Sequence, residues 1–405
     1  MSVPHDQMTY SQEKAKELEE LSQTSPGTPM GRLLRQFWQP IAASEDVKPG
    51  TAIPVRILSE DLTLYRGESG SPHVVAHRCP HRGTVLHAGW IEGDNIRCMY
   101  HGWMFSGHGQ CVEQPAEAIS FAAKVKILSY PMTEYGGLIF VFMGEGSPPE
   151  FRLLRKPQLE REDGVRWVNE QVWPCNWMQQ VENSMDAAHV SFVHRWAMKS
   201  RLVSAVTSKP PELSYQETDA GILQIAKRSE KNTRLSDWTF PNCNHIFTPS
   251  QRLHPDDPWT HLFNWMVPVD DCNTRRFSVA YSTVSGEAAT RLRNYITNDW
   301  PKYNPAEHHN ALFYHKVLPE EIEFGLNGVT NAQDYVAQVG QGAIADRSRE
   351  RLGQSDEGII FLRKIFLREL KKLKEGLPLK EWRALERAQE MPTQPGEAGE
   401  ERKTG

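Results

Sequence analysis

The chain has 405 residues, and its net charge is −5 at pH 7 with an isoelectric point near 6.3. These values give no electrostatic basis for binding nucleic acid or an anionic membrane surface. Hydrophobic residues make up 39% of the chain, which is sufficient for full cores, and the length predicts two domains. Because the sequence contains no run of eighteen apolar residues, no membrane-spanning helix is expected.

The N-terminus and the cysteines predict a cytoplasmic protein. Residues 1–20 are polar and acidic, which is unlike a signal peptide. Four scattered cysteines are expected to be free thiols in a reducing compartment. They are Cys111, Cys175, Cys243 and Cys272.

The first elements expected along the chain are helices, followed by short strands. Residues 11–23 predict a charged helix, and Thr28 before Pro29 predicts an N-cap that opens a second helix over Met30–Trp38. From about 40 to 148, short alternating or apolar runs are separated by Gly, Pro and Asp. This pattern predicts a small β domain that ends near Ser147-Pro148-Pro149.

Two short motifs within this β region carry metal-ligand chemistry. Cys79-Pro-His81 and Cys98-Met-Tyr-His101 are separated by sixteen residues. A set of two Cys and two His also occurs in zinc sites, but zinc fingers group Cys with Cys and His with His. Here each motif supplies one Cys and one His, which suits a [2Fe-2S] cluster in which two His replace two Cys on one iron.

The run CPHRGTVLHAGWIEGDNIRCMYHGW resembles the Rieske domains of aromatic-ring oxygenases. Rieske proteins of respiratory chains carry two additional cysteines and a serine near the cluster. Thr84, Tyr100 and Trp103 stand at about those positions here. Fewer hydrogen bonds to the cluster sulfurs predict a lower reduction potential, which suits an electron donor to iron and oxygen.

Further strands and helices are expected after this region. A strand over Trp167–Val172 precedes a helix from about Asn176, and several strands follow between about 200 and 285. The clearest of them is 260–269, which is rich in aromatic and β-branched residues.

A final helix is expected to begin at Ser355 as its N-cap and to end at Gly376 and Pro378. An apolar stripe runs along it at helical spacing. The residues past about 385 are rich in Pro, Gly and Glu, which predicts disorder. The expected division of the chain is a helical segment over 1–38, a β domain over 39–148, a catalytic domain over 149–380 and a disordered tail over 381–405.

The segment 176–194 carries a second set of candidate ligands. Asp186 and His189 are three residues apart and would share one face of a helix. His189 and His194 are five apart, about 140° around an ideal helix. For both histidines to bind one metal, either the helix ends between them or it contains a π-like irregularity.

The string ENSxDxxHxxxxH resembles the mononuclear iron motif of Rieske non-heme iron oxygenases. The resemblance implies that His189 and His194 are two ligands of a 2-His-1-carboxylate Fe(II) site with open positions for O₂. Asp334, in a Gln-Asp context similar to the phthalate dioxygenase branch, is the favoured third ligand. Asp356 is the alternative, although the N-terminus of the last helix already explains an acid there.

The resemblance extends over nearly the whole chain and implies an α+β protein. It comprises a small all-β Rieske domain and a larger catalytic domain with a curved antiparallel sheet packed on helices, of the helix-grip or START-like type. Asp186 resembles the carboxylate that links a cluster histidine, His81 or His101, of one chain to an iron histidine of the next. The resemblance therefore implies a homotrimer or a dimer of trimers. It also implies that a flavin and iron-sulfur reductase, with or without a ferredoxin, delivers electrons from NAD(P)H.

The resemblance implies an oxygenase that uses O₂ to hydroxylate or O-demethylate a small aromatic carboxylate. The alternatives are N-demethylation or desaturation of a non-aromatic substrate, and a pure electron carrier, which would leave most of the chain unexplained. An anionic substrate requires a cation or several donors. The candidates are Arg195, Lys199, Arg201 and His245, and the candidate pocket walls are Phe247, His261, Asn264 and Trp265.

Overall fold

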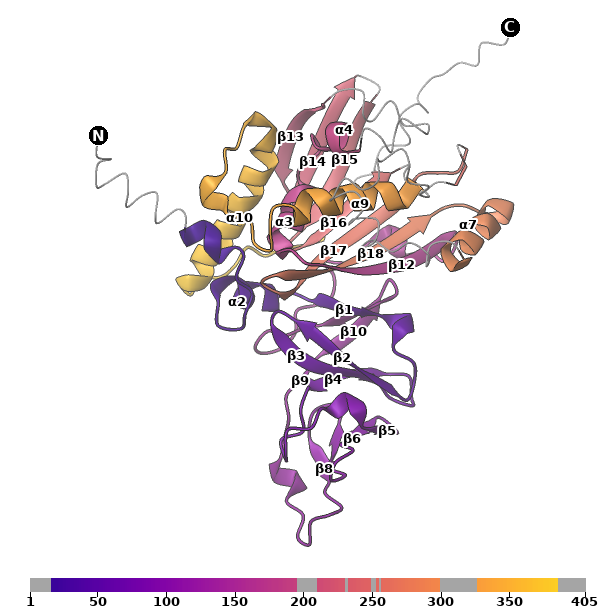
Figure 1. The fold of residues 1–405 in the computed structure, drawn as a ribbon, viewed down its shortest axis with the longest axis vertical. Coiled ribbons are helices and arrows are strands. Elements are labelled where there is room, and N and C mark those ends of the chain that lie inside the picture. The colour runs from indigo at the N-terminus through magenta and orange to yellow at the C-terminus, as the bar shows by residue number, and fades with distance from the viewer. Residues whose placement is uncertain are drawn as a thin grey trace, which may run out of the picture.

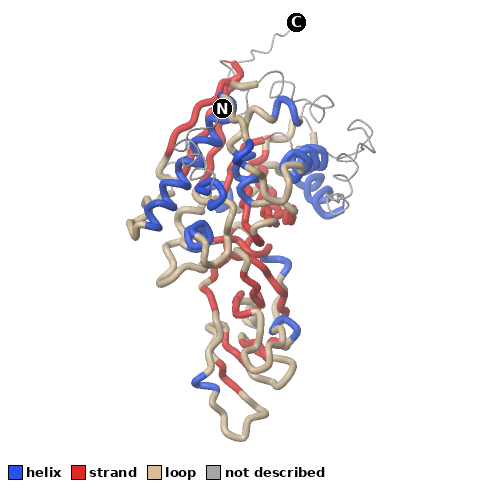
Figure 2. Tube along the Cα trace, turned by 60° about the vertical axis from the view of Figure 1, so that its left-hand side comes forward, coloured by secondary structure: helices blue, strands red, loops and turns tan. Residues whose placement is uncertain are grey.

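The computed structural model describes residues 16–194, 210–229, 232–248, 253–254, 256–298 and 326–384. The fold is α+β, as predicted, with a small all-β part at one end and a broad antiparallel sheet packed on helices at the other (Figure 1). Figure 2 shows that the longer helices all lie at the end that holds the broad sheet. Part of the predicted helix over 11–23 and most of the predicted disordered tail lie outside the described residues.

The small all-β part contains three antiparallel sheets, with strand orders β1-β11-β10, β2-β3-β4-β9 and β5-β6-β7-β8. Gly and Asp residues at the turns separate strands that are only two to seven residues long. The strands are β1 (Gln39–Ala43), β2 (Thr51–Ile57), β3 (Glu60–Arg66), β4 (Pro72–Ala76), β5 (Trp90–Glu92), β6 (Asn95–Arg97), β7 (Met104–Ser106), β8 (Cys111–Glu113), β9 (Ser129–Tyr130), β10 (Met132–Tyr135) and β11 (Leu138–Val141).

The larger part is built on one seven-stranded sheet with the order β12-β18-β17-β16-β15-β14-β13, in which every neighbouring pair is antiparallel. Its strands are β12 (Val165–Trp173), β13 (Glu212–Glu217), β14 (Gly221–Ser229), β15 (Asn232–Thr239), β16 (Cys243–Thr248), β17 (Thr260–Asp270) and β18 (Asn273–Ser282). The helices are α2 (Pro29–Arg35), α3 (Trp177–Ser184), α4 (Val190–Val193), α7 (Gly286–Asn298), α9 (Leu326–Val339) and α10 (Glu357–Lys374). Helices α3, α9 and α10 lie on one face of the sheet (Figure 1).

The two faces of this sheet have different partners because successive side chains of a strand point in opposite directions. On β17, the Oδ1 atom of Asn264 accepts hydrogen bonds from Arg276, which also reaches Asn331 of α9. The next residue, Trp265, packs its ring against Phe140 of β11, with centroids 5.8 Å apart. One face therefore carries the helices, and the other joins the small β part through a shared core.

Most of the predicted elements are confirmed. Thr28 caps α2 through a hydrogen bond from the backbone N–H of Gly31, although the helix ends at Arg35 rather than Trp38. Asn176 caps α3 in the same way through Met178. The free thiols are also confirmed, because no cysteine forms a disulfide and all six lie among the described residues.

The predicted start of the final helix is wrong. Helix α10 begins at Glu357, and residues 354–356 before it form a separate 3₁₀ turn. This turn is stabilised by the carboxylate of Asp356, which accepts a hydrogen bond from the Gly353 N–H at 2.7 Å. Ser355 lies within the turn and does not cap the helix. Gly376, with φ of +68°, follows the end of α10 as predicted.

A buried ionic cluster connects α3 to the C-terminal part of the chain. Glu182 of α3 accepts hydrogen bonds from Arg347 at 3.1 and 3.0 Å and from Arg363 of α10 at 2.6 Å. Burial raises the pKa of Glu182, but the two guanidinium groups outweigh burial and lower it overall. The carboxylate is therefore charged, and it forms ion pairs with two buried cations.

Replacing Glu182 with Gln should lower the free energy of unfolding by about 3–5 kcal/mol, because it leaves buried guanidinium charge uncompensated. Urea unfolding followed by circular dichroism measures this loss. The matched control is Glu150→Gln, which breaks an exposed ion pair with Arg152 and should cost less than about 1 kcal/mol. Equal losses for the two variants would contradict a buried role for Glu182.

Candidate metal centres

The loop between β4 and β5 and the loop between β6 and β7 hold the first candidate site in matching conformations. The Cys79 N–H donates to the Thr84 carbonyl at 2.8 Å, and the Cys98 N–H donates to the Trp103 carbonyl at the same distance. In each loop a glycine N–H then donates back to the cysteine carbonyl, from Gly83 at 2.9 Å and from Gly102 at 3.0 Å.

Both glycines adopt the left-handed conformation, with φ of +77° at Gly83 and +75° at Gly102. A side chain is strained in that region, so glycine allows each loop to turn sharply around its cysteine. The local sequence therefore determines the shape of both loops.

The side chains of the two loops converge. The rings of His81 and His101 have centroids 4.4 Å apart, and His81 stacks on Trp103 at 4.6 Å. Together the loops line a small, partly open pocket. It is lined by Cys79, His81, Arg82, Thr84, Cys98, Tyr100, His101 and Trp103.

The chemistry of this pocket fits an iron-sulfur cluster. Burial is the main cause that raises the pKa of the Cys79 thiol to about 12, and the neighbouring Cys98 contributes. Thiolates in such a position require a bound cation, which a cluster supplies. Among the described residues, no group forms a hydrogen bond with the buried Nδ1 atom of His81.

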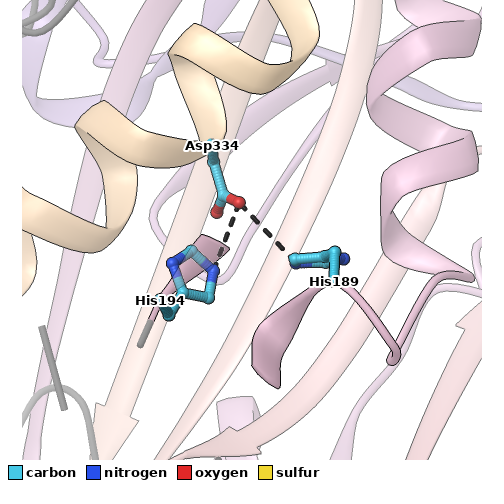
Figure 3. Close-up of side chains that lie close together, drawn as sticks. All are labelled: His189, His194 and Asp334. Atoms are coloured by element: carbon cyan, nitrogen blue, oxygen red, sulfur yellow. Dashed lines mark ion pairs between the residues drawn. The ribbon is translucent and has the colours of Figure 1, made fainter. Parts of the chain in front are cut away.

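The second candidate site joins residues from distant parts of the chain. His189 and His194 flank the one-turn helix α4, and Asp334 lies on α9 (Figure 3). One ligand atom from each of the three lies within 4.8 Å of the others. The Oδ1 atom of Asp334 is 3.3 Å from the Nε2 atom of His194 and 3.7 Å from that of His189.

The backbone between α3 and α4 corrects one prediction. Asp186 and His189 do not share a helix face, because α3 ends at Ser184 and residues 185–189 are not helical. The Oδ1 atom of Asp186 accepts hydrogen bonds from the N–H groups of Ala188 at 2.9 Å and of His189 at 3.1 Å. Such a side-chain bond to the backbone competes with helix formation.

The end of the helix before His189 also explains how two histidines five residues apart can point at one site. The helix does not continue through both of them, and each histidine stands at one end of the four-residue helix α4. Neither of the two possibilities left open by the sequence is seen, because α3 ends before His189 rather than between the histidines, and α4 contains no π-like irregularity. The centroids of the two rings are 5.4 Å apart.

The triad has a defined polar environment. Burial lowers the pKa of His194, but Asp334, together with Gln333, outweighs burial and raises it. For Asp334 the directions are reversed. Burial raises the pKa of its carboxyl group, but His194, His189 and Arg276 lower that pKa overall. The Nδ1 atom of His194 contacts the Oε1 atom of Gln333 at 3.2 Å, so its Nε2 atom is the one directed at Asp334.

These donors fit a divalent iron. Two imidazoles and one carboxylate on one side of a site form the set typical of non-heme Fe(II) oxygenases. Among the described residues, no hydrogen-bond partner is found for the buried Oδ1 atom of Asp334, which is available as a ligand. The second carboxylate candidate, Asp356, lies in the turn before α10 and is not part of this group.

Asp186 lies beside the triad on the side of His189. Its Oδ2 atom is 3.6 Å from the Nδ1 atom of His189, the ring nitrogen opposite the one that faces Asp334. Burial raises the pKa of Asp186, but His189 and two backbone N–H groups lower it overall, so the carboxylate is charged.

Several predicted substrate-binding residues lie on the wrong face of the sheet. The register pairs Phe247 with His261, and His245 with Phe263, on the same face as Trp265. That face is opposite to the one that carries Asn264 and α9, so only Asn264 of the four candidate pocket walls faces the triad. His245 instead contacts Asp237 at 2.7 Å. Arg195, Lys199 and Arg201 lie outside the described residues.

Comparison with known proteins gives these sites a family context. Residues 37–130 match the Rieske [2Fe-2S] domain, and residues 141–380 match the domain described as "LigXa C-terminal domain like". The second match alone covers more than half of the chain. The chain belongs to the Rieske oxygenases. It is thus an oxidoreductase that uses a Rieske cluster and a mononuclear iron.

The chain is 32% identical to the 5,5'-dehydrodivanillate O-demethylase oxygenase subunit of Sphingobium sp., over 89% of this chain and 81% of the relative. It is 29% identical to the phthalate 4,5-dioxygenase oxygenase subunit of Pseudomonas putida, over 86% and 84%. A third relative, 31% identical over 85% and 75%, is a tert-butanol monooxygenase / tert-amyl alcohol desaturase oxygenase subunit from Aquincola tertiaricarbonis.

Solved structures show the same fold. The terminal oxygenase of carbazole 1,9a-dioxygenase from Novosphingobium sp. superposes with a TM-score of 0.61 at 19% identity, over 88% of this Rieske oxygenase and 96% of that chain. Among the residues that the structure describes, no helix has the length and apolar character needed to cross a bilayer.

Sequence inspection missed two features near the triad. One is the contact of Gln333 with His194, for which the Gln-Asp pair was the only signal. The other is a pair of strand arginines, Arg228 and Arg234. Arg228 is in phase with Ile222 and Ala226 along β14, and both of these are fully buried. That alternation was a signal that Arg228 points inward.

Proposed function

We propose that this Rieske oxygenase hydroxylates or O-demethylates an aromatic carboxylate. The observation that carries the proposal is the cluster of His189, His194 and Asp334 on the helix face of the sheet. The similarity to an O-demethylase and a phthalate dioxygenase supports the substrate class.

In this proposal the [2Fe-2S] cluster is held by Cys79, His81, Cys98 and His101, and Fe(II) by His189, His194 and Asp334. When bound, the cluster supplies electrons and the iron activates O₂. The protein itself orients the iron ligands. Gln333 holds the His194 ring through its Nδ1 atom, and Asp186 stands at the Nδ1 atom of His189.

The assembly we propose is a homotrimer or a dimer of trimers in the cytoplasm. Sheet β5–β8 lies at one end of the molecule, well away from helix α9 on the broad sheet (Figure 1), which favours electron transfer between neighbouring chains. Electrons would come from NAD(P)H through a flavin and iron-sulfur reductase, with or without a ferredoxin. We further propose the domain limits 39–148 and 149–380, with 1–38 as a helical extension and 381–405 as a tail.

Asp186→Asn should retain both metal centres and lower the turnover rate by about 10–100-fold, as expected for a residue that orients a ligand and joins two centres. Iron and sulfide analysis, the Rieske EPR signal and O₂ consumption measure these three properties. Asp256→Asn serves as a control because the Asp256 side chain is 91% exposed. Normal turnover in Asp186→Asn would refute the bridging role.

The proposed substrate class is tested by O₂ uptake with a surrogate reductase. The panel contains benzoate, phthalate, vanillate, tert-butanol and a quaternary amine. Uptake with formation of a hydroxylated or demethylated aryl acid supports the proposal. Uptake with tert-butanol alone would support the second candidate, a non-aromatic substrate, which the Aquincola relative favours.

A further inference from the structure

Arg228 of β14 is a buried cation for which no partner is found in the part of the chain that the structure describes. Only 5% of the residue is exposed, and none of its three guanidinium nitrogens has a hydrogen-bond partner among the described residues. Burying an unpaired charge costs several kcal/mol, so native proteins seldom leave one uncompensated. Such an exception requires an explanation, and the ability to bind an anion is a natural candidate.

The other buried arginines show how unusual Arg228 is. The structure describes four more arginines that are buried to a similar extent, and each of them contacts a carboxylate. Their partners are Glu60 for Arg35, Glu134 for Arg66, Glu182 for Arg347, and Glu182 and Glu350 for Arg363. Of these five arginines, Arg228 is the one for which the described residues supply no acidic partner.

Arg228 lies at an irregularity in the strand. The pairing of β14 with β15 shifts between Lys227 and Ser229, so Arg228 occupies a bulge. Bulges redirect side chains and are common next to active sites. Two residues earlier on the same face, Ala226 is fully buried. The side chain of Gln224, on that face as well, donates to the Met185 carbonyl at 2.9 Å, at the end of α3.

A second arginine lies on the same face of the neighbouring strand. Arg234 of β15 pairs with Ala226, and its Nε atom also lacks a partner among the described residues. Burial is the main cause that lowers the pKa of Arg234 to about 10, and the charge of Arg228 contributes. Trp238, on the same face of β15 as Arg234, is in register with Asn244 and, through it, with Asn264, so the two arginines lie on the face of the sheet that carries α9.

We propose that Arg228 and Arg234 bind the carboxylate of the substrate and so hold its aromatic ring beside the iron triad. This inference rests on the proposed function and adds the residues that select the substrate. A planar guanidinium can donate two parallel hydrogen bonds to a carboxylate, and a second arginine can neutralise the remaining charge. An anion between the two groups would relieve both the unpaired burial and the mutual repulsion.

The test compares Arg228→Met with Lys227→Met in the reconstituted holoenzyme. Lys227 is the adjacent residue on β14, but its side chain is exposed. Its replacement therefore removes one positive charge, as Arg228→Met does, but from the opposite face of the sheet. The probes are phthalate and vanillate with their methyl esters, and binding is measured by anaerobic calorimetry. Arg228→Met should weaken binding of the acids about tenfold or more while leaving ester binding unchanged, and Lys227→Met should change neither.

Thermal unfolding of the same variants without substrate provides an independent readout. Removing an unpaired buried charge should raise the Tm of Arg228→Met, whereas removing an arginine with a structural partner would lower it. We call Arg228 and Arg234 the carboxylate subsite. A lowered Tm of Arg228→Met with unchanged acid binding would overturn this subsite. The subsite would also be overturned if the wild-type protein bound the esters as tightly as the acids.

The subsite and the proposed function fail in different ways. If the wild type consumes O₂ with an aryl acid and Arg228→Met binds that acid equally well, the subsite is wrong and the function stands. If the wild type binds no aryl acid and oxidises only tert-butanol, the proposed substrate class is wrong and the subsite falls with it. Arg228→Lys, which keeps the charge but not the planar fork, should recover part of the acid binding in support of the proposal.

Discussion

Asp334→Ala should lose the mononuclear iron and all oxygenase activity while it keeps the Rieske cluster. Asp334 is the only carboxylate of the triad, and its Oδ1 atom lies within 3.7 Å of a nitrogen of each histidine. Without it, two neutral imidazoles remain to hold a dication, and affinity should fall by at least about 100-fold. Metal analysis after dialysis measures the iron that is lost, and the Rieske EPR signal shows whether the cluster is kept, so the two measurements distinguish the two centres.

Asp356→Ala is the matched control for this experiment. Asp356 was the other carboxylate suggested by the sequence, and its side chain accepts a hydrogen bond from the Gly353 N–H. Its replacement should keep both metals and cost at most about 1–2 kcal/mol of stability, as for the loss of a cap. Full iron in Asp334→Ala together with iron loss in Asp356→Ala would reverse the ligand assignment.

Cys79→Ser should abolish the Rieske EPR signal and turnover, yet leave the mononuclear iron in place. The Cys79 side chain is buried in the pocket between the two loops, and a serine hydroxyl is a poor substitute for a soft thiolate on iron. The sites are on separate parts of the chain, so loss of one should not empty the other. Iron and acid-labile sulfide counts measure the result.

Cys111→Ser provides the comparison for Cys79→Ser. Cys111 is equally buried in the same β region, but its Sγ atom contacts the Glu113 carbonyl at 3.5 Å. It should retain the cluster and lose only a small part of the stability. An intact Rieske signal in Cys79→Ser would remove Cys79 from the proposed ligand set.

The local motifs were the most predictable part of the molecule. Each cysteine-histidine loop closes through hydrogen bonds between residues no more than five apart, so a single segment of sequence encodes its shape. The caps of α2 and α3 were predictable for the same reason, since Thr28 and Asn176 act on backbone groups within three residues.

Predictions failed where several weak local preferences competed. A helix through Asp186 was a reasonable expectation, but its carboxylate binds the N–H groups of Ala188 and His189 and ends the helical stretch. The start of α10 was misplaced because Asp356 stabilises a 3₁₀ turn that contains Ser355. In both cases a side-chain hydrogen bond to the backbone outweighed helical propensity.

The sequence by itself determined which residue types are available for metal chemistry, since spacing and neighbours of the Cys, His and Asp residues are covalent facts. Only the tertiary structure decided how they meet. The positions of His194 and Asp334 are 140 residues apart in the chain but their side chains are 3.3 Å apart, because α9 packs over the strands beside α4. The same packing set the inward face of the sheet, which excluded His261 and Trp265 from the triad's side and brought Arg228 and Arg234 to it. The alternation within one strand shows which residues share a face, but register is a property of the whole sheet, so a single strand's sequence could not reveal which face turns toward the triad.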